Sequence, residues 1–231
     1  MDNAEVRLVS GKDIVSLEQE GLAALRGRSR QVVVDVGTGD ARMAYRLAQA
    51  HPDWLVIGLD PNWRGMIETA VRSRRKPARG GVPNLLLVAA SIETPPEELA
   101  GIADEVRVLM PWGALLRGLV LGEPDVCGGL RQVARPAATV EVTVGTSIWS
   151  PPVPAGVRDL PELTADYVRD TLAPRWARAG LRITGTDLVR AESAAGLATS
   201  WARRLGSGRI ELLRQVTAVA ASRTNPGPAV T

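Results

Sequence analysis

The stretch that decides the fold is Val32-Val33-Val34-Asp35-Val36-Gly37-Thr38-Gly39-Asp40. Its apolar beginning is typical of a buried strand, and the two glycines supply backbone that can adopt positive φ and approach a ligand closely. Asp40 is placed to begin a helix that continues through Met43 and Leu47. The motif alone fits either a nucleotide-like ligand site or an ordinary turn between a strand and a helix, so the neighbouring segments must decide.

A second apolar strand supports the ligand interpretation. Residues 55–59 lead into Asp60, the position where doubly wound folds place an acid on ribose hydroxyls. A dinucleotide is disfavoured, because Arg42 stands where such sites carry a third small residue and Asp35 precedes the first glycine. The pattern of acid, two glycines and second acid resembles the S-adenosylmethionine site of class I methyltransferases. That ligand carries ribose and adenine but no pyrophosphate.

Composition narrows the class of protein. The chain has 231 residues, 45% of them hydrophobic, which is enough for one substantial core. The single cysteine, Cys127, excludes a disulfide framework and a thiolate metal site, so we expect no metal and a reducing, cytoplasmic location. A run of about 18 apolar residues and the basic start of a signal peptide are both missing from the sequence, so we expect no membrane contact.

Strand and helix patterns alternate along most of the chain. Strand patterns occupy residues 32–36, 55–60, 85–89, 105–110, 139–144, 182–189 and 210–220. They predict an α/β fold with a seven-stranded, mostly parallel sheet that ends in an antiparallel strand. We expect one domain over residues 1–221, in which residues 1–28 form an N-terminal hairpin and helix extension. Residues 190–209 are expected to form a functional linker between the last two strands, and residues 222–231 a disordered tail.

The arginines gather in two stretches, although the net charge is only +3. The first stretch contains Arg72, Arg74, Arg75, Lys76 and Arg79, and the second contains Arg203, Arg204 and Arg209. The first fits either a solvated helix face or an RNA contact, whereas the neighbouring Trp201 favours contact for the second. The chain has six tryptophans and no phenylalanine, and an indole among arginines suggests stacking on a flat ligand. The tryptophans outside these motifs, expected to serve packing, are Trp54, Trp149 and Trp176.

Several motifs together resemble one family. They are Asp35-Val36-Gly37-Thr38-Gly39-Asp40, Leu109-Met110-Pro111-Trp112-Gly113, Leu116-Arg117-Gly118 and Thr199-Ser200-Trp201-Ala202-Arg203-Arg204-Leu205. Over essentially its whole length the chain resembles the 16S rRNA (adenine(1408)-N1)-methyltransferases, the kanamycin-apramycin type of aminoglycoside-resistance enzymes. The resemblance implies S-adenosylmethionine-dependent methylation of N1 of the decoding-site adenine of 16S rRNA in the small (30S) ribosomal subunit. We expect a monomer.

The resemblance also implies roles for individual residues. The cofactor site would be lined by Asp35, Gly37, Thr38, Gly39, Asp60, Pro61, Ile92, Glu93 and Leu109. Within it, Asp60 would bond the ribose, and Ile92 and Leu109 would lie beside the adenine. The flipped target adenine would stack between Trp112 and Trp201, with Thr199 helping to position the reacting groups. The RNA-binding residues would be Arg72, Arg74, Arg75, Lys76, Arg79, Arg203, Arg204 and Arg209.

The chemistry of these residues agrees with an N1 target. Adenine N1 has an in-plane lone pair and needs no base to attack a sulfonium methyl group, so His51 reads as a loop residue. Trp112 and its neighbours offer no side-chain acceptor of the kind that exocyclic-amine enzymes use, and Cys127 lies inside an expected helix. Two alternatives stay open. One is a methyltransferase for another RNA base or a small molecule, and the other is a non-catalytic RNA-binding module.

Overall fold

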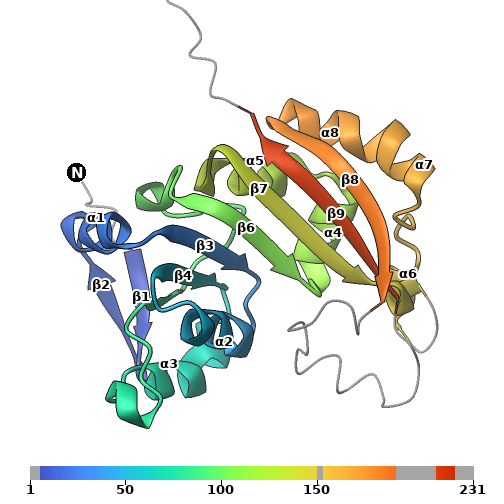
Figure 1. Ribbon diagram of the computed structural model, residues 1–231. Helices are drawn as coiled ribbons and strands as arrows, with labels where there is room; N and C mark the ends of the chain where they lie inside the picture. The colour runs from blue at the N-terminus through green and yellow to red at the C-terminus, as the bar shows by residue number, and fades with distance from the viewer. Residues whose placement is uncertain (1–5, 150–152, 191–211, 222–231) are drawn as a thin grey trace, which may run out of the picture.

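The computed structural model describes residues 6–149, 153–190 and 212–221. Their strands form one sheet of nine, in the order β2-β1-β5-β4-β3-β6-β7-β9-β8 (Figure 1). The strands are β1 Val6–Ser10, β2 Asp13–Leu17, β3 Gln31–Val36, β4 Trp54–Leu59, β5 Leu85–Val88, β6 Ala103–Leu109, β7 Ala134–Gly145, β8 Leu181–Arg190 and β9 Leu212–Ala220.

The centre of the sheet has the predicted parallel arrangement. Strands β5, β4, β3, β6 and β7 run parallel, whereas β9 pairs antiparallel with both β7 and β8. Strand β3 lies between β4 and β6, so the chain changes direction across the sheet at β3. Ligands of open α/β sheets bind beyond the carboxyl ends of the strands at such a point. This places the stretch that follows β3 at the expected binding edge.

The prediction of seven strands with a separate N-terminal extension is wrong in one respect. Strands β1 and β2 form the expected hairpin, but β1 also pairs with β5 through Leu8 and Val88. The amide of Ala89 donates a further hydrogen bond to the carbonyl of Arg7, at 2.9 Å. Without the hairpin, β5 would be an edge strand with unpaired backbone groups. The hairpin therefore completes the sheet, which has nine strands.

Helices cover the sheet on two sides. The α-helices are α1 Gln19–Arg28, α2 Arg42–Ala50, α3 Ile67–Ser73, α4 Gly113–Leu121, α5 Pro124–Val133, α6 Ala155–Arg158, α7 Ala165–Tyr167 and α8 Ala173–Arg178. Alternate residues of β4 show the division, because Leu55 and Ile57 belong to the core with α1, α4, α5 and α8, whereas Val56 packs with α2 and α3. Strands buried on both sides explain the continuous apolar runs in the sequence.

Three local expectations differ from the structure. Helix α2 begins at Arg42 rather than at Asp40, because Ala41 before it adopts a left-handed conformation with φ of 56°. The sequence of residues 164–179 predicts one helix, but the structure divides it into α7, a π-helical turn at Val168–Leu172, and α8. Strand β7 begins at Ala134, opposite Ala103 of β6, because the pairing continues beyond an irregularity in the register.

Candidate active site

The glycine turn after β3 needs its glycines. Gly37 and Gly39 have φ of 70° and 60°, in the region that side chains disfavour. A Cβ on Gly37 would also lie 2.5 Å from Cδ2 of Leu115 in α4. The amide of Gly37 donates to the carbonyl of Leu59 at 2.8 Å, which anchors the turn to the end of β4. The backbone therefore passes close to α4 and to β4 at the binding edge.

Asp35 is a buried carboxylate at this edge. Its residue is 5% exposed, and the Thr38 hydroxyl donates a hydrogen bond to its Oδ2 at 2.6 Å. Burial raises the pKa of Asp35 from 3.8 to about 6, against the lowering effects of the Thr38 hydrogen bond and of Arg107. The nearby charges of Asp60 and Asp40 raise it further. A partly compensated carboxylate of this kind is suited to receive a cationic ligand.

Asp60 connects the glycine turn to the end of β4. Its Oδ2 accepts a hydrogen bond from the amide of Gly39 at 2.9 Å, and its Oδ1 accepts one from the amide of Asn62 at 2.7 Å. Each carboxylate oxygen can accept a second hydrogen bond, so Asp60 can hold the turn and still bind ligand hydroxyls. Pro61 follows at the exposed start of the next segment. The predicted ribose contact is chemically compatible with this geometry.

The segment after β5 forms another wall of the predicted site. Ile92 is buried, and the Ser91 hydroxyl donates a hydrogen bond to the carboxylate of Glu93. Helix α5 approaches this segment so closely that a Cβ on Gly129 would lie 1.6 Å from the carbonyl oxygen of Ile92. Gly129 carries no signal in the sequence, since only the packing of α5 reveals the contact. Leu109, half-buried, ends β6 on the other side of β3.

Trp112 stands on a constrained turn after β6. Its residue is 39% exposed, and it is the N-cap of α4. Met110 has φ of 50° and Gly113 has φ of 60°, so a left-handed residue lies close to the tryptophan on each side. A small pocket adjoins the ring, lined by Met110, Pro111, Trp112, Gly145, Ser147, Ile148 and Val153. Trp112 is predicted from its motif, whereas the lining residues that follow β7 belong to no predicted motif.

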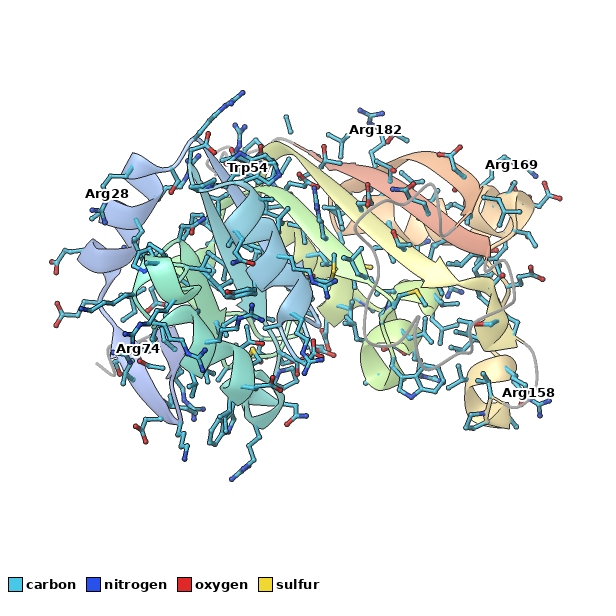
Figure 2. The ribbon with its side chains drawn as sticks, turned by 60° about the horizontal axis from the view of Figure 1, so that its bottom comes forward. Arg28, Trp54, Arg74, Arg158, Arg169 and Arg182 are labelled. Carbon is cyan, nitrogen blue, oxygen red and sulfur yellow. The ribbon has the colours of Figure 1, made fainter. Side chains whose placement is uncertain are left out.

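The first basic stretch begins in α3 and continues beyond it. Its predicted RNA-binding residues, all exposed, are Arg72, Arg74, Arg75, Lys76 and Arg79. Arg74 follows the end of α3 and points into solvent (Figure 2). The guanidinium of Arg72 lies 4.6 Å from the ring centre of Tyr45, and the Tyr45 hydroxyl donates to the carbonyl of Gly80 at 2.6 Å. Aromatic stacking and this hydrogen bond orient part of the stretch.

Arg64, which is not among the predicted RNA-binding residues, adds another exposed cation near α3. Its guanidinium lies 4.7 Å from the ring centre of Trp63. Trp63 and Arg64 belong to the 3-10 turn that leads into α3. Their adjacency in the sequence was the available signal, because an arginine beside a tryptophan can stack on its ring.

The second half of the predicted RNA-binding surface lies outside the described residues. This applies to Thr199, Trp201, Arg203, Arg204 and Arg209, to most of the expected linker over residues 190–209, and to the tail over residues 222–231. The flanking strands are described. Leu213 of β9 pairs with Gly145 of β7 and with Val189 of β8. Strand β8 therefore ends, and β9 begins, at the sheet edge that carries Trp112.

Groups expected to be structural are placed accordingly. Cys127 is buried in α5, and burial raises the pKa of its thiol to about 12, so the thiol stays protonated at neutral pH. Trp176 is buried in the core, and the indole of Trp149 donates to the carbonyl of Leu160 at 3.0 Å. The rings of Trp54 and His51 stack with centroids 3.7 Å apart. Packing roles are confirmed for all three tryptophans.

The fold and the site define a class I S-adenosylmethionine-dependent methyltransferase. The glycine turn, Asp35 and Asp60 gather at the carboxyl ends of β3 and β4, and the neighbouring strands are β6, which ends at Leu109, and β5, which leads into the segment with Ile92. A family model described as NpmA, 16S rRNA (adenine(1408)-N(1))-methyltransferase, matches residues 7–220. The chain belongs to this family. In the described part of the chain, no helix is long and apolar enough to cross a membrane.

Individual relatives agree with the family. The 16S rRNA (adenine(1408)-N(1))-methyltransferase of Streptoalloteichus hindustanus is 42% identical over 204 residues, which cover 88% of this chain and 94% of the relative. The Escherichia coli protein with the same description is 29% identical over 203 residues, covering 87% and 93%. A crystal structure of a tryptophan-to-alanine mutant from Catenulisporales acidiphilia with cosubstrate SAM has a TM-score of 0.89 and 50% identity, covering 96% and 99%. The structure of the 16S rRNA methyltransferase KamB has a TM-score of 0.83 and 39% identity, covering 93% and 99%.

Proposed function

We propose that this chain transfers a methyl group from S-adenosylmethionine to N1 of adenine 1408 of 16S rRNA, and that the modification confers aminoglycoside resistance. The substrate would be the assembled 30S subunit, approached by a monomer in the cytoplasm. The observation that carries the proposal is the exposed ring of Trp112, held on a constrained turn at the carboxyl end of β6, next to the strand that leads into the acid-and-glycine site. A flat aromatic ligand can stack on such a ring close to the methyl donor.

The residues present fit S-adenosylmethionine. Asp60 keeps acceptor capacity for ribose hydroxyls, and the buried Asp35 carboxylate offers a negative charge to a cationic ligand. Gly37, Thr38 and Gly39 would let the ligand approach the backbone, with Pro61 and Glu93 at its margins and Ile92 and Leu109 beside the adenine. S-adenosylmethionine, when bound, supplies an electrophilic methyl group on a sulfonium.

The target base would be held by stacking. Flipping a base out of its helix costs a few kcal/mol, and stacking on aromatic side chains returns about 1–3 kcal/mol per base. Trp112 would supply one ring and Trp201 the other, with Thr199 positioning the reacting groups. Because N1 attacks without losing a proton, the protein contributes mainly orientation and close approach rather than a base.

The basic residues would hold the rRNA. The exposed cations near α3, Arg72, Arg74, Arg75, Lys76 and Arg79, would bind phosphates of the subunit surface. Arg203, Arg204 and Arg209 would bind phosphates near the flipped nucleotide. Reversing the charge of Arg204 and Arg209 tests this RNA contact directly. An rRNA methyltransferase should lose activity on its RNA substrate, whereas a small-molecule methyltransferase would keep its turnover.

Transfer of tritiated methyl groups tests the proposed substrate. We expect label to enter 16S rRNA when intact 30S subunits are supplied, and much less to enter naked 16S rRNA. Equal labelling of naked rRNA would contradict the assembled subunit as substrate.

Calorimetry with S-adenosylmethionine addresses the alternative of a silent RNA-binding module. Binding by the wild type and its loss in Asp60→Ala would exclude that alternative.

A further inference from the structure

A row of polar side chains runs along β3 and β6 toward the proposed cofactor site. The Gln31 amide donates a hydrogen bond to Oε2 of Glu105 at 3.0 Å, and Nε of Arg107 bonds to Oε1 of the same carboxylate at 2.5 Å. Arg107 in turn lies directly opposite Asp35 in the parallel register of β6 and β3. Figure 1 shows no helix of the described residues in front of β6, β7 and β9, on the side opposite α4 and α5.

The register places Arg107 and Asp35 on one face of the sheet. Neighbouring strands lie about 4.8 Å apart, and directly opposite residues project to the same side. Val34 and Val106, the preceding pair in the register, both belong to the core on the opposite side. Arg107 is half-buried, with a side chain 28% exposed, so its charge is only partly screened by water. The strand register fixes the backbone of Arg107, and the ion pair with Glu105 fixes its side chain.

The groups that influence the charge of Asp35, one hydroxyl and three charged side chains, come from several elements. Thr38 and Asp40 lie in the turn after β3, Asp60 follows β4, and Arg107 lies in β6. Two of these groups are carboxylates, which oppose a negative charge on Asp35, whereas Arg107 favours it. On the other side of Arg107, Glu141 of β7 occupies the opposing position in the register. Arg107 thus stands between the cofactor-facing acid and the acids of β6 and β7.

We infer that Arg107 is a positioning residue that keeps Asp35 ionised for the cationic part of S-adenosylmethionine, and that Gln31 and Glu105 hold it in place. The inference rests on the proposed function. It adds a residue outside the expected cofactor-lining set, on the part of the sheet face over β6 that no helix of the described residues covers. Arg107 acts through Asp35, so its contribution belongs to cofactor affinity and to the pH dependence of that affinity.

The pH dependence has a definite sign. A ligand that requires ionised Asp35 binds more weakly as the pH falls through the pKa of that carboxyl, which lies at about 6 in the wild type. Losing an opposite charge within reach raises a carboxyl pKa by about 1 pH unit or more. The acid limb of the profile of affinity against pH, where binding weakens as the pH falls, should therefore move to higher pH when Arg107 is removed. Titration of the ligand itself is common to all variants and leaves the comparison intact.

The test is isothermal titration of the full chain with S-adenosylmethionine from pH 5.5 to pH 8. Arg107→Met should move the acid limb upward by about 1 pH unit, with about tenfold weaker binding on the limb. Arg107→Lys keeps the charge and should restore most of the wild-type profile. Arg135→Met is the matched control, because Arg135 also pairs with a carboxylate, Asp104, but near the amino end of the parallel strands. It should leave the limb in place.

The outcomes separate the inference from the proposed function. A wild type that binds no S-adenosylmethionine at any pH would refute the function itself. A wild type that binds, together with an Arg107→Met limb that does not move, would overturn only the role of Arg107. A uniform loss of affinity without a shifted limb would mark a merely structural role and would also overturn it. Thermal unfolding checks each variant, and Arg107→Gln replaces Arg107→Met if that variant does not fold.

Discussion

Asp35 and Asp60, at the carboxyl edge of the sheet, differ in their burial and in the donors that hydrogen-bond to their carboxylates. Asp35 is buried with a hydroxyl donor, whereas Asp60 is half-buried and accepts hydrogen bonds from two backbone amides. Backbone amides compensate the charge of Asp60 locally, and burial disfavours the charge of Asp35. Ionised Asp35 therefore lowers the free energy of unfolding, while its charge is available to bind a cationic ligand, as is common at functional sites.

Replacing Asp35 by Asn should stabilise the protein while weakening cofactor binding. The folded-state pKa of about 6 exceeds the unfolded value of 3.8, so the contribution of Asp35 to stability is present below pH 4 and is lost as the pH rises through 6. At pH 8 the difference corresponds to at most about 3 kcal/mol in favour of Asp35→Asn. Urea unfolding at pH 5 and pH 8 measures it. A variant that is less stable than the wild type at pH 8 would contradict the burial argument.

Replacing Trp112 should affect the base and spare the cofactor. Trp112→Ala removes a stacking surface worth about 1–3 kcal/mol, so methylation of 30S subunits should fall on the order of 10- to 100-fold. Trp112→Phe keeps an aromatic face and should retain more activity. Single-turnover methylation measures the rates, and calorimetry should give unchanged affinity for S-adenosylmethionine. Equal activity of the alanine and phenylalanine variants would argue against stacking.

At the scale of elements, close approaches between neighbours shape the site. Gly129 of α5 packs closely against the segment that carries Ile92 and Glu93, and Leu115 of α4 packs closely against Gly37. Left-handed residues before Pro111 and after Trp112 hold the turn between β6 and α4. Such conformations are sparsely populated and persist where the surrounding structure enforces them. The site is therefore built from the ends of elements whose packing leaves little freedom.

Gly129→Ala tests the contact between α5 and the site. The added methyl group would overlap the carbonyl oxygen of Ile92, so we expect a loss of about 1–3 kcal/mol in stability and weaker cofactor binding. The adjacent Gly128 is the matched control, because a Cβ there meets nothing within 4 Å. Gly128→Ala should be neutral or stabilise the helix by up to about 1 kcal/mol. Thermal unfolding and calorimetry distinguish them, and indistinguishable variants would refute the tight contact.

At the scale of the whole molecule, the sheet separates two tasks. The carboxyl edge carries Trp112 and the acids of the proposed cofactor site, while the exposed cations in and after α3 lie on the segment that leads to the amino end of β5. Binding to the rRNA backbone depends on released counterions and hence on salt. The modest net charge of +3 conceals this distribution.

Reversing two cations beyond α3 should weaken binding to the subunit in a salt-dependent way. Arg74→Glu combined with Arg75→Glu should lower 30S affinity and reduce the slope of log affinity against log salt by about 2. Affinity for S-adenosylmethionine should not change. Arg182→Glu, an exposed arginine on β8 far from Arg74 in Figure 2, is the control. Filter binding over a salt series measures the slopes, and equal slopes for both proteins would remove the α3 region from the RNA interface.

Much of the fold follows from sequence because the relevant signals are local. Apolar runs and glycine turns predict all the central strands, and they predict that Asp35 and Asp60 lie at the ends of β3 and β4, where the structure has them. The attachment of the hairpin to β5 could not be predicted, since it depends on which edge remained unpaired. Gly129 and Arg107 were also missed, because the first depends on helix packing and the second on register between distant strands.

Primer extension on 30S subunits treated with the protein and S-adenosylmethionine tests the central claim most directly. Methylation of N1 blocks base pairing, so reverse transcriptase should stop at adenine 1408 when both protein and cofactor are present, and read through when either is omitted. A stop at a guanine, or no stop on subunits that have incorporated methyl groups, would contradict the claim.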